Sequence, residues 1–174
     1  MNIALADLKR ICPLSRVERM APFVEPLNAA MTEFDITTPA RQAMFLAQLA
    51  HESGGFRYVR EIASGEAYED RADLGNDYPG DGVKFKGRGL IQITGRTNYS
   101  ACGAALGLDL LSQPELLEPP ANAARSAGWF WYSRGLNALA DVDDFKRITK
   151  RINGGLNGYE ERLAYYNRAR KVMA

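Results

Sequence analysis

The sequence predicts a mainly α-helical (α+β) domain that contains one small β-hairpin. An apolar stripe at helical spacing follows Thr38, and helical patterns return beyond Pro114 and continue to the C-terminus. Between these regions, apolar and lysine residues alternate from Val83 to Lys86, and a glycine-containing turn leads into the alternating run Leu90–Thr94. Helices on both sides of a single short hairpin are typical of an α-rich domain.

Length and composition indicate one folded domain. The 174 residues are enough to bury a sizeable core, and no repeat or linker divides them, so we expect residues 1–174 to form a single domain with no separate binding module. Apolar residues at 46% and charged residues at 25% exclude wholesale disorder. The net charge of +1 gives no strong overall attraction to nucleic acid or membranes.

The N-terminal third predicts short helices followed by one longer core helix. Prolines interrupt residues 8–31, which favours several short helices there. The longer helix begins at Pro39, with Thr38 as its N-cap, and ends before Gly54-Gly55. Glu52 therefore lies at the C-terminal end of a core helix, where its side chain can face a cleft.

The middle of the chain predicts a polar loop and then the hairpin. Residues 60–82 are polar and contain several glycines, as loops do. In the hairpin of residues 83–94, strand alternation places Ile91 and Ile93 on the core face, and Gln92 and Thr94 on the opposite face.

The C-terminal part predicts three helices with a basic excess. Pro119-Pro120 opens a helix over residues 121–134, Asp141 caps a helix that continues through Ile152, and a last helix runs from Tyr159. Residues 145–174 hold eight Lys and Arg against two Glu, a charge of +6 that leaves −5 for the rest. This excess fits either a solvated helix face or attraction to an anionic polymer or lipid surface.

Cysteine, histidine and the N-terminus bear on cofactors and location. Cys12 and Cys102 are far apart and without CxxC spacing, which favours two reduced thiols over a disulfide. With His51 as the one histidine, we expect no metal site and no cofactor. The N-terminus has no apolar run of signal-peptide length and no segment reaches membrane-spanning length, so we expect synthesis in the cytoplasm and no stable membrane insertion.

Two glutamates predict glycoside hydrolysis. An inverting glycosidase needs a general acid and a general base roughly 6.5–9.5 Å apart. Glu52 is the candidate acid, and Glu61, nine residues later and beyond the glycines, is the candidate base. Spacing alone does not choose Glu61 over the other acidic residues of the same loop, which are Glu66, Glu69, Asp70 and Asp73.

Three motifs resemble family 19 of the glycoside hydrolases. They are AHESGGF at residues 50–56, KGRGLIQITGRTNY at residues 86–99 and RINGGLNG at residues 151–158. That family includes plant-type chitinases and many bacteriophage endolysins. The resemblance implies a two-lobed, lysozyme-like fold with a cleft between the lobes and the hairpin beside the cleft, so residues 1–174 would be one catalytic domain.

The resemblance also implies roles for individual residues. Glu52 matches the general acid, Glu61 fits the base of the short endolysin-like members, and Thr94 matches the residue that helps hold the attacking water. Positions that line the sugar cleft are matched by Gln92, Asn98, Tyr99 and Asn153. Arg162 matches an arginine that supports the active-site charges. Asn157 departs from the plant chitinases, which have a glutamate there, so we expect a simpler charge network.

The short chain and the absence of a signal peptide favour the endolysin branch of the family. We therefore expect an inverting hydrolase of peptidoglycan glycan strands that lyses the host cell. It would be a monomer released from the host cytoplasm by a holin-type partner, and it would act at the cell wall or in the periplasm. A chitinase would use the same residues on another polymer. A lytic transglycosylase shares an ES…GLxQI pattern but would need neither Glu61 nor Thr94, and retention of Glu52 with Thr94 argues against a non-catalytic sugar-binding relative.

Overall fold

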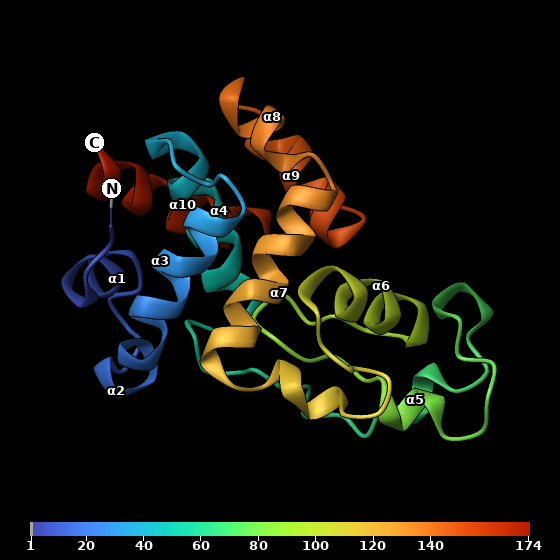
Figure 1. Cartoon of the computed structure of the whole chain (residues 1–174). Coiled ribbons are helices and arrows are strands. Elements are labelled where there is room, and N and C mark those ends of the chain that lie inside the picture. Colours follow the sequence, from blue (N-terminus) through green and yellow to red (C-terminus); the bar gives the residue numbers. More distant parts are fainter. Residues whose placement is uncertain (1) are drawn as a thin grey trace.

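Helices make up most of the computed structural model, which describes residues 2–174 (Figure 1). The α-helices are α1 (Leu5–Ile11), α2 (Val17–Met20), α3 (Val24–Glu33), α4 (Pro39–Glu52), α5 (Asp81–Lys84), α6 (Arg96–Leu106), α7 (Pro120–Ser133), α8 (Leu136–Asp141), α9 (Phe145–Asn153) and α10 (Tyr159–Met173). Short 3-10 helices cover Ala21–Phe23, Glu66–Tyr68, Ala72–Leu74 and Pro114–Leu117. The predicted mainly helical class is confirmed.

Helix α4 is the centre of the core. It packs along α10, and its residues 42–50 are all buried. The Thr38 hydroxyl accepts a hydrogen bond from the Arg41 amide at 3.3 Å, and Pro39 occupies the first turn, as predicted. Gly54 and Gly55 follow with φ of 60° and 71°, a left-handed conformation that ends the helix.

The remaining helices form two groups around α7. Figure 1 shows α1–α4 and α8–α10 gathered on one side, while α5, α6 and the long loops lie on the other. Helix α7 lies between them and packs against α3 and α6. The N-terminal residues form the short helices that the prolines predicted, and the division into two groups agrees with the predicted two-lobed arrangement.

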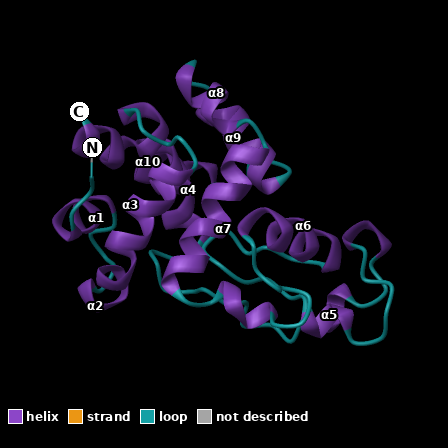
Figure 2. Cartoon of the chain, viewed as in Figure 1, coloured by secondary structure: helices purple, strands orange, loops and turns teal. Residues whose placement is uncertain are grey.

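The predicted β-hairpin of residues 83–94 is not formed. Figure 2 shows helices and loops only across the described residues, and Val83 lies in helix α5. Two isolated bridges, Arg88 with Ile93 and Arg60 with Arg88, are the β pairing in this region. Gly89 and Gln92 both have positive φ, 82° and 59°, so the chain turns too tightly for a ladder to extend.

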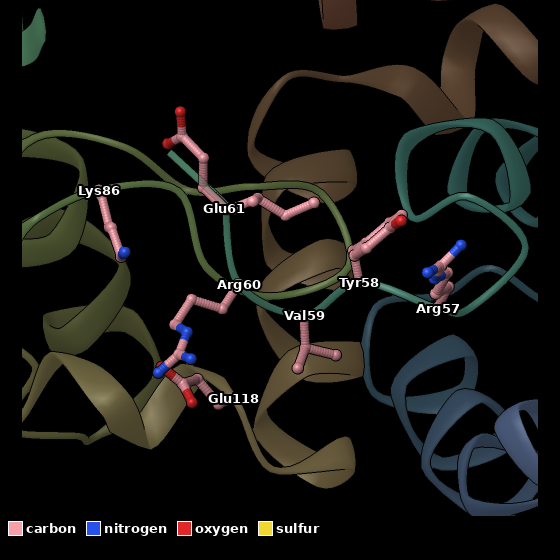
Figure 3. Close-up of a pocket in the computed structure, with 8 residues that line it drawn as sticks. Arg57, Tyr58, Val59, Arg60, Glu61, Lys86 and Glu118 are labelled. Atoms are coloured by element: carbon pink, nitrogen blue, oxygen red, sulfur yellow. The ribbon is translucent and has the colours of Figure 1, made fainter. Parts of the chain in front are cut away.

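Part of the predicted side-chain pattern survives without the hairpin. Ile91 and Ile93 are buried, while Gln92 and Thr94 remain half-buried. The bridge between Arg60 and Arg88 lays the segment that follows α4 against this turn (Figure 3). The turn therefore positions polar side chains beside that segment, although no sheet is present there.

One predicted helix cap and one helix also differ from the prediction. Asp141 does not cap a helix, because α8 ends there. The cap of α9 is Asp144, whose carboxylate accepts a hydrogen bond from the Arg147 amide at 3.0 Å. Helix α6 was not predicted, since its sequence alternates small and polar residues with few apolar ones.

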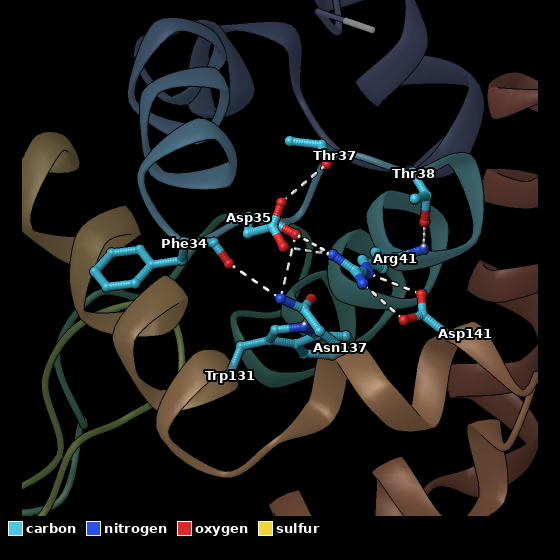
Figure 4. Close-up of polar contacts among 8 residues, drawn as sticks. All are labelled: Phe34, Asp35, Thr37, Thr38, Arg41, Trp131, Asn137 and Asp141. Carbon is cyan, nitrogen blue, oxygen red and sulfur yellow. Dashed lines mark hydrogen bonds and ion pairs between the residues drawn. The ribbon is translucent and has the colours of Figure 1, made fainter.

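A polar network centred on Arg41 joins α4 to α8 and to the turn before α4 (Figure 4). Its Nε and Nη2 donate to the two carboxylate oxygens of Asp141 at 2.8 and 2.6 Å, and Nη1 donates to the Asp35 carbonyl and carboxylate, both at 2.8 Å. Asn137 donates to the carbonyls of Phe34 and Asp35, and accepts from Trp131 Nε1 at 2.8 Å. Residues distant in sequence are thereby held at one end of α4.

The cysteines are both free, as predicted, and both are buried. Burial raises the pKa of the Cys12 and Cys102 thiols to about 12, which keeps them protonated and unreactive.

Within residues 2–174, no helix combines the length and apolar character needed to cross a membrane. Nor do three or more His, Cys, Asp or Glu side chains in this range gather as metal ligands would.

The Arg41 network predicts a pH-dependent loss of stability in an Arg41→Gln variant. The hydrogen bond from Arg41 lowers the pKa of Asp141 below its unfolded value of about 3.9. Its stabilisation is therefore fully present above that value and is lost as pH falls through the folded pKa. We expect urea unfolding at pH 7 to show a lower free energy of unfolding for the variant, and the deficit to shrink between pH 4 and pH 2.

The matched control is Arg71→Gln, which removes an exposed arginine paired locally with Asp73 at 2.6 Å. It should change stability less at pH 7, because it joins no distant elements. A deficit for Arg41→Gln that stays constant from pH 7 to pH 2 would contradict the role of the Asp141 pair.

Candidate active site

Glu52 is held by a buried arginine from another helix. Its Oε1 lies 2.6 Å from Nη2 of Arg162, whose side chain is 2% exposed, whereas the Glu52 side chain is 21% exposed. Arg162 comes from the first turns of α10, so the packing of α10 along α4 brings the two together. The adjacent His51 contacts Glu161 of α10 at 2.6 Å, a second link between these helices. The carboxylate predicted to be the acid is thus held through one oxygen, while the side chain stays partly exposed and lines a cavity.

Arg162 also donates to two further acceptors. Nη1 donates to Gln48 Oε1 at 2.6 Å, and Nε donates to the Asn157 carbonyl at 3.1 Å. Gln48 in turn donates to the Thr149 hydroxyl at 2.9 Å inside the core. Asn157, the position at which we expected a simpler charge network, thus contributes its backbone carbonyl to the arginine.

Gln48 was not identified from the sequence as part of the site, although its position in the helix could have indicated it. It is a polar residue in the middle of an apolar helix, four positions before Glu52 and therefore on the same helix face. A fully buried glutamine needs hydrogen-bond partners, and here those partners are Arg162 and Thr149.

Glu61 is oriented by a tyrosine and by the backbone. Tyr68 donates its hydroxyl to Oε1 at 2.9 Å, and the Gly87 amide donates to Oε2 at 3.1 Å. The Glu61 amide donates back to the Gly87 carbonyl at 2.9 Å. Burial and the Glu61 carboxylate raise the pKa of Tyr68, which keeps its hydroxyl protonated as a donor. Tyr68 and Gly87 were not identified from the sequence.

Glu52 and Glu61 line the same cavity. It has a volume of about 290 Å³, and its other lining residues are Tyr58, Arg60, Ile62, Ala63 and Gln92. A second cavity of about 460 Å³ adjoins it and shares four of these residues, including Glu61 (Figure 3). That second cavity is completed by Arg57, Val59, Lys86 and Glu118. The two cavities form one open groove along residues 57–63, with Glu52 in the smaller cavity and Glu61 lining both.

Glu69, the rival candidate base, has both carboxylate oxygens engaged elsewhere. Oε1 accepts from the Gly80 amide at 2.5 Å, and Oε2 accepts from the Gly82 amide at 2.8 Å. It does not line either cavity of the groove. Its contacts close the loop before α5, so the geometry favours Glu61 as the base.

Gln92, Thr94 and Asn98 form a hydrogen-bonded series that begins in the cavity. Gln92 lines the cavity and donates through Nε2 to the Gly89 carbonyl at 3.0 Å. Thr94 donates its hydroxyl to the Gln92 carbonyl at 3.0 Å, and Asn98 donates to the Thr94 carbonyl at 2.8 Å. Thr94 and Asn98 lie outside the cavity lining and support the backbone of Gln92, so direct contact with water or sugar stays a prediction for both.

Tyr99 does not line the groove, contrary to the prediction. It is fully buried, donates to the Lys86 carbonyl at 2.5 Å and accepts from Arg88 Nη1 at 3.1 Å. The unpredicted helix α6 is the reason, because its first turn directs Tyr99 into the core, where it packs against Phe85. Tyr99 therefore holds the backbone of Lys86 in place and cannot touch a sugar in this conformation.

Asn153 is the last residue of α9 and also lies outside the cavity lining. Its Nδ2 is buried and has no hydrogen-bond partner among the residues that the structure describes. An unsatisfied buried donor costs stability, so this position is compatible with a donor that a ligand would use. Its contact with substrate stays a prediction.

Comparison with known proteins connects this site to one family. The family model described as chitinase class I, of glycoside hydrolase family 19, matches residues 26–139. A Haemophilus influenzae protein described as a glycosyl hydrolase family 19 domain-containing protein is 33% identical over 174 residues, covering 82% of this chain and 84% of its own length. An endochitinase of Arabidopsis thaliana is 40% identical over 151 residues, covering 79% of this chain but only 51% of the plant protein.

Solved structures agree with these sequence matches. A bacterial family 19 chitinase superimposes with a TM-score of 0.81 at 25% identity, covering 100% of this chain and 96% of its own. Chitinase C from Streptomyces griseus gives a TM-score of 0.80 at 25% identity, covering 98% of this chain and 76% of the other. The chain thus spans about half of the plant enzyme but nearly all of the compact bacterial one.

Because Glu61 and Glu69 make different contacts, replacing each with glutamine should have different effects. Glu61→Gln should lower kcat by about 10²–10⁴-fold, the usual contribution of a general base, and change the melting temperature little. Glu69→Gln should retain most activity but melt at a lower temperature, because it weakens two hydrogen bonds that close its loop. If the Glu69→Gln variant is inactive and the Glu61→Gln variant is active, Glu69 and not Glu61 is the general base.

Gly87 offers a test of how tightly the base is positioned. A Cβ at this position would lie 2.7 Å from Gln92 Oε1 and 3.2 Å from Glu61 Oε2, so Gly87→Ala must displace both side-chain ends. Such displacement should lower kcat by roughly 10–100-fold, with little change in urea unfolding. Gly155→Ala is the control, because its Cβ would meet no atom within 4 Å. Equal activity of the two variants would contradict a tightly positioned base.

Proposed function

The chain belongs to family 19 of the glycoside hydrolases, and we propose that it is an endolysin-type enzyme that cleaves peptidoglycan glycan strands by an inverting two-carboxylate mechanism. The observation that carries the proposal is the shared cavity, in which Glu52 and Glu61 approach the same space from different elements. Glu52 ends a helix, whereas Glu61 is held by the turn at Gly87.

In this mechanism Glu52 is the general acid and donates its proton to the glycosidic oxygen as the C1–O bond breaks. Glu61 is the base: it takes a proton from a water molecule whose oxygen attacks C1 from the opposite face. Arg162 steadies the carboxylate that Glu52 becomes. Tyr68 and the Gly87 amide keep Glu61 oriented, and Gln92 offers its amide to the water or to a sugar hydroxyl.

The charge of the groove supports peptidoglycan as the substrate. Chitin is an uncharged amino-sugar polymer, whereas peptidoglycan strands carry carboxylates on their stem peptides and on any lactyl group that bears no peptide. Three cationic residues, Arg57, Arg60 and Lys86, line the larger cavity of the groove. A chitinase is the second candidate, because relatives of this chain are described as endochitinases and the two glutamates would serve either polymer.

The proposal includes a role in host-cell lysis. The enzyme would act as a monomer on the cell wall or in the periplasm, after release from the cytoplasm by a holin-type partner. Only part of the basic excess in residues 145–174 is available to attract an anionic envelope. Arg162 and Arg168 point inward, where they contact Glu52 and the Ile11 carbonyl. The exposed remainder on α9 includes Lys146, Arg147 and Lys150, which can approach an anionic envelope.

Product analysis on purified peptidoglycan and on chitin oligomers tests this function. Attack by water predicts ordinary reducing ends, with inverted anomeric configuration visible by NMR soon after mixing. Anhydro-sugar ends, lighter by one water in mass spectra, would instead identify a lytic transglycosylase. Glu52→Gln should reduce turnover by about 10²–10⁴-fold on whichever polymer is cut. If the enzyme cleaves chitin but not peptidoglycan, or cleaves chitin and does not clear outer-membrane-permeabilised Gram-negative cells, the endolysin proposal is wrong and the chitinase alternative remains.

A further inference from the structure

The larger cavity of the groove holds more cationic side chains than acidic partners can neutralise. Its charged lining residues are Arg57, Arg60 and Lys86 on the one hand, and Glu61 and Glu118 on the other. In Figure 3, Lys86 lies on one side of Glu61, Arg57 lies beside Tyr58 on the other, and Arg60 points toward Glu118. The cations are therefore distributed along the wall of a cavity that Glu61 also lines.

Glu118 is shared between two arginines, and its shorter contact is with Arg88 and not with Arg60. The carboxylate is already paired at 3.0 Å with Arg88, whose side chain is 10% exposed and which also donates to the Lys84 carbonyl. Arg60 lies 4.0 Å from the same carboxylate oxygen, at the limit of an ion pair, and its side chain is 60% exposed. An exposed contact at that distance contributes little, so the Arg60 guanidinium keeps donors for another acceptor.

Lys86 is likewise without an acidic partner among residues 2–174. Its Nζ donates to the Ala63 carbonyl at 3.1 Å, which fixes the ammonium group at the cavity wall. An ammonium group has three donors, so two remain for a ligand. Tyr99 accounts for the backbone position of Lys86, because it donates to the Lys86 carbonyl from the core.

The backbone of Arg60 is also fixed. It pairs through an isolated bridge with Arg88, and Arg88 pairs with Ile93 in the tight turn that carries Gln92. The two cations are therefore attached to the same framework that positions Glu61 through Gly87. A group bound between Arg60 and Lys86 would consequently lie at a fixed distance from the glycosidic bond that is cleaved.

We infer that Arg60 and Lys86 form a carboxylate-binding subsite that selects acidic glycan strands over neutral ones. The inference rests on the proposed glycan hydrolysis at Glu52 and Glu61 and names what determines its substrate. Hydroxyl and acetamido groups of a neutral strand leave both cations unpaired, whereas a carboxylate forms charge-assisted hydrogen bonds with them. In peptidoglycan that carboxylate comes from the lactyl ether or from the stem peptide, and the two sources have the same chemistry.

The test compares kcat/KM of the wild type and of an Arg60→Gln/Lys86→Gln double variant on four soluble substrates. They are peptide-bearing glycan strands, peptide-free strands with free lactyl carboxylates, the same strands with those carboxylates amidated, and chitin oligomers. We expect the double variant to lose about tenfold in kcat/KM on a carboxylate-bearing substrate and nothing on the amidated strands or chitin. Loss on peptide-free strands assigns the lactyl group, and loss confined to peptide-bearing strands assigns the peptide.

The matched control is Arg10→Gln/Lys171→Gln, which removes the same charge from exposed positions on α1 and α10, outside the groove lining. It should keep wild-type kcat/KM on all four substrates. Equal losses by both double variants, or a loss that is the same on amidated and free strands, would overturn the subsite. A wild type that cleaves chitin but no peptidoglycan strand would instead overturn the proposed function.

Discussion

The ion pair between Glu52 and Arg162 is the contact on which the rest of the site depends. A guanidinium that is 2% exposed costs several kcal/mol in desolvation unless it is paired and hydrogen-bonded. Glu52, Gln48 and the Asn157 carbonyl together satisfy Arg162, so the packing of α10 on α4 and the placement of the carboxylate stabilise each other. The same carboxylate must also reach solvent to act on a substrate. Placing it on the last residue of a core helix meets both requirements.

The second carboxylate follows from how that helix ends. Two left-handed glycines after Glu52 reverse the chain, so the segment with Glu61 returns along the same cavity only nine residues later. There the Glu61 amide donates to the Gly87 carbonyl, and the Glu61 carboxylate accepts from the Gly87 amide and from the Tyr68 hydroxyl. One glutamate is thus oriented by core packing and the other by a tight turn, which lets them occupy separate positions around a single space.

Sequence patterns predicted the local features well and the distant contacts poorly. Periodicity and capping located α4, and the paired glycines placed Glu52 at its end, because these signals lie within a few residues. Alternation at residues 83–94 imitated a strand, since no local pattern reveals a positive φ at a non-glycine residue such as Gln92. The burial of Tyr99 depended on the unpredicted helix α6. The partnership of Gln48 with Arg162 joins positions 114 residues apart, and only the folded structure brings them together.

In the proposed function, the catalytic pair and the residues that choose the substrate differ in how the fold holds them. The two glutamates are held by α4, α10 and the Gly87 turn, all of which are tied to the core. The side chains of Arg57 and Arg60 extend from the exposed segment after α4, where Arg57 contacts the ring of Tyr58 and Arg60 lies 4.0 Å from Glu118. Exposed side chains of this kind can change with little cost in stability. Under the proposed function, substitutions along this single stretch of groove would change the preference for neutral or acidic strands while the catalytic pair stays fixed.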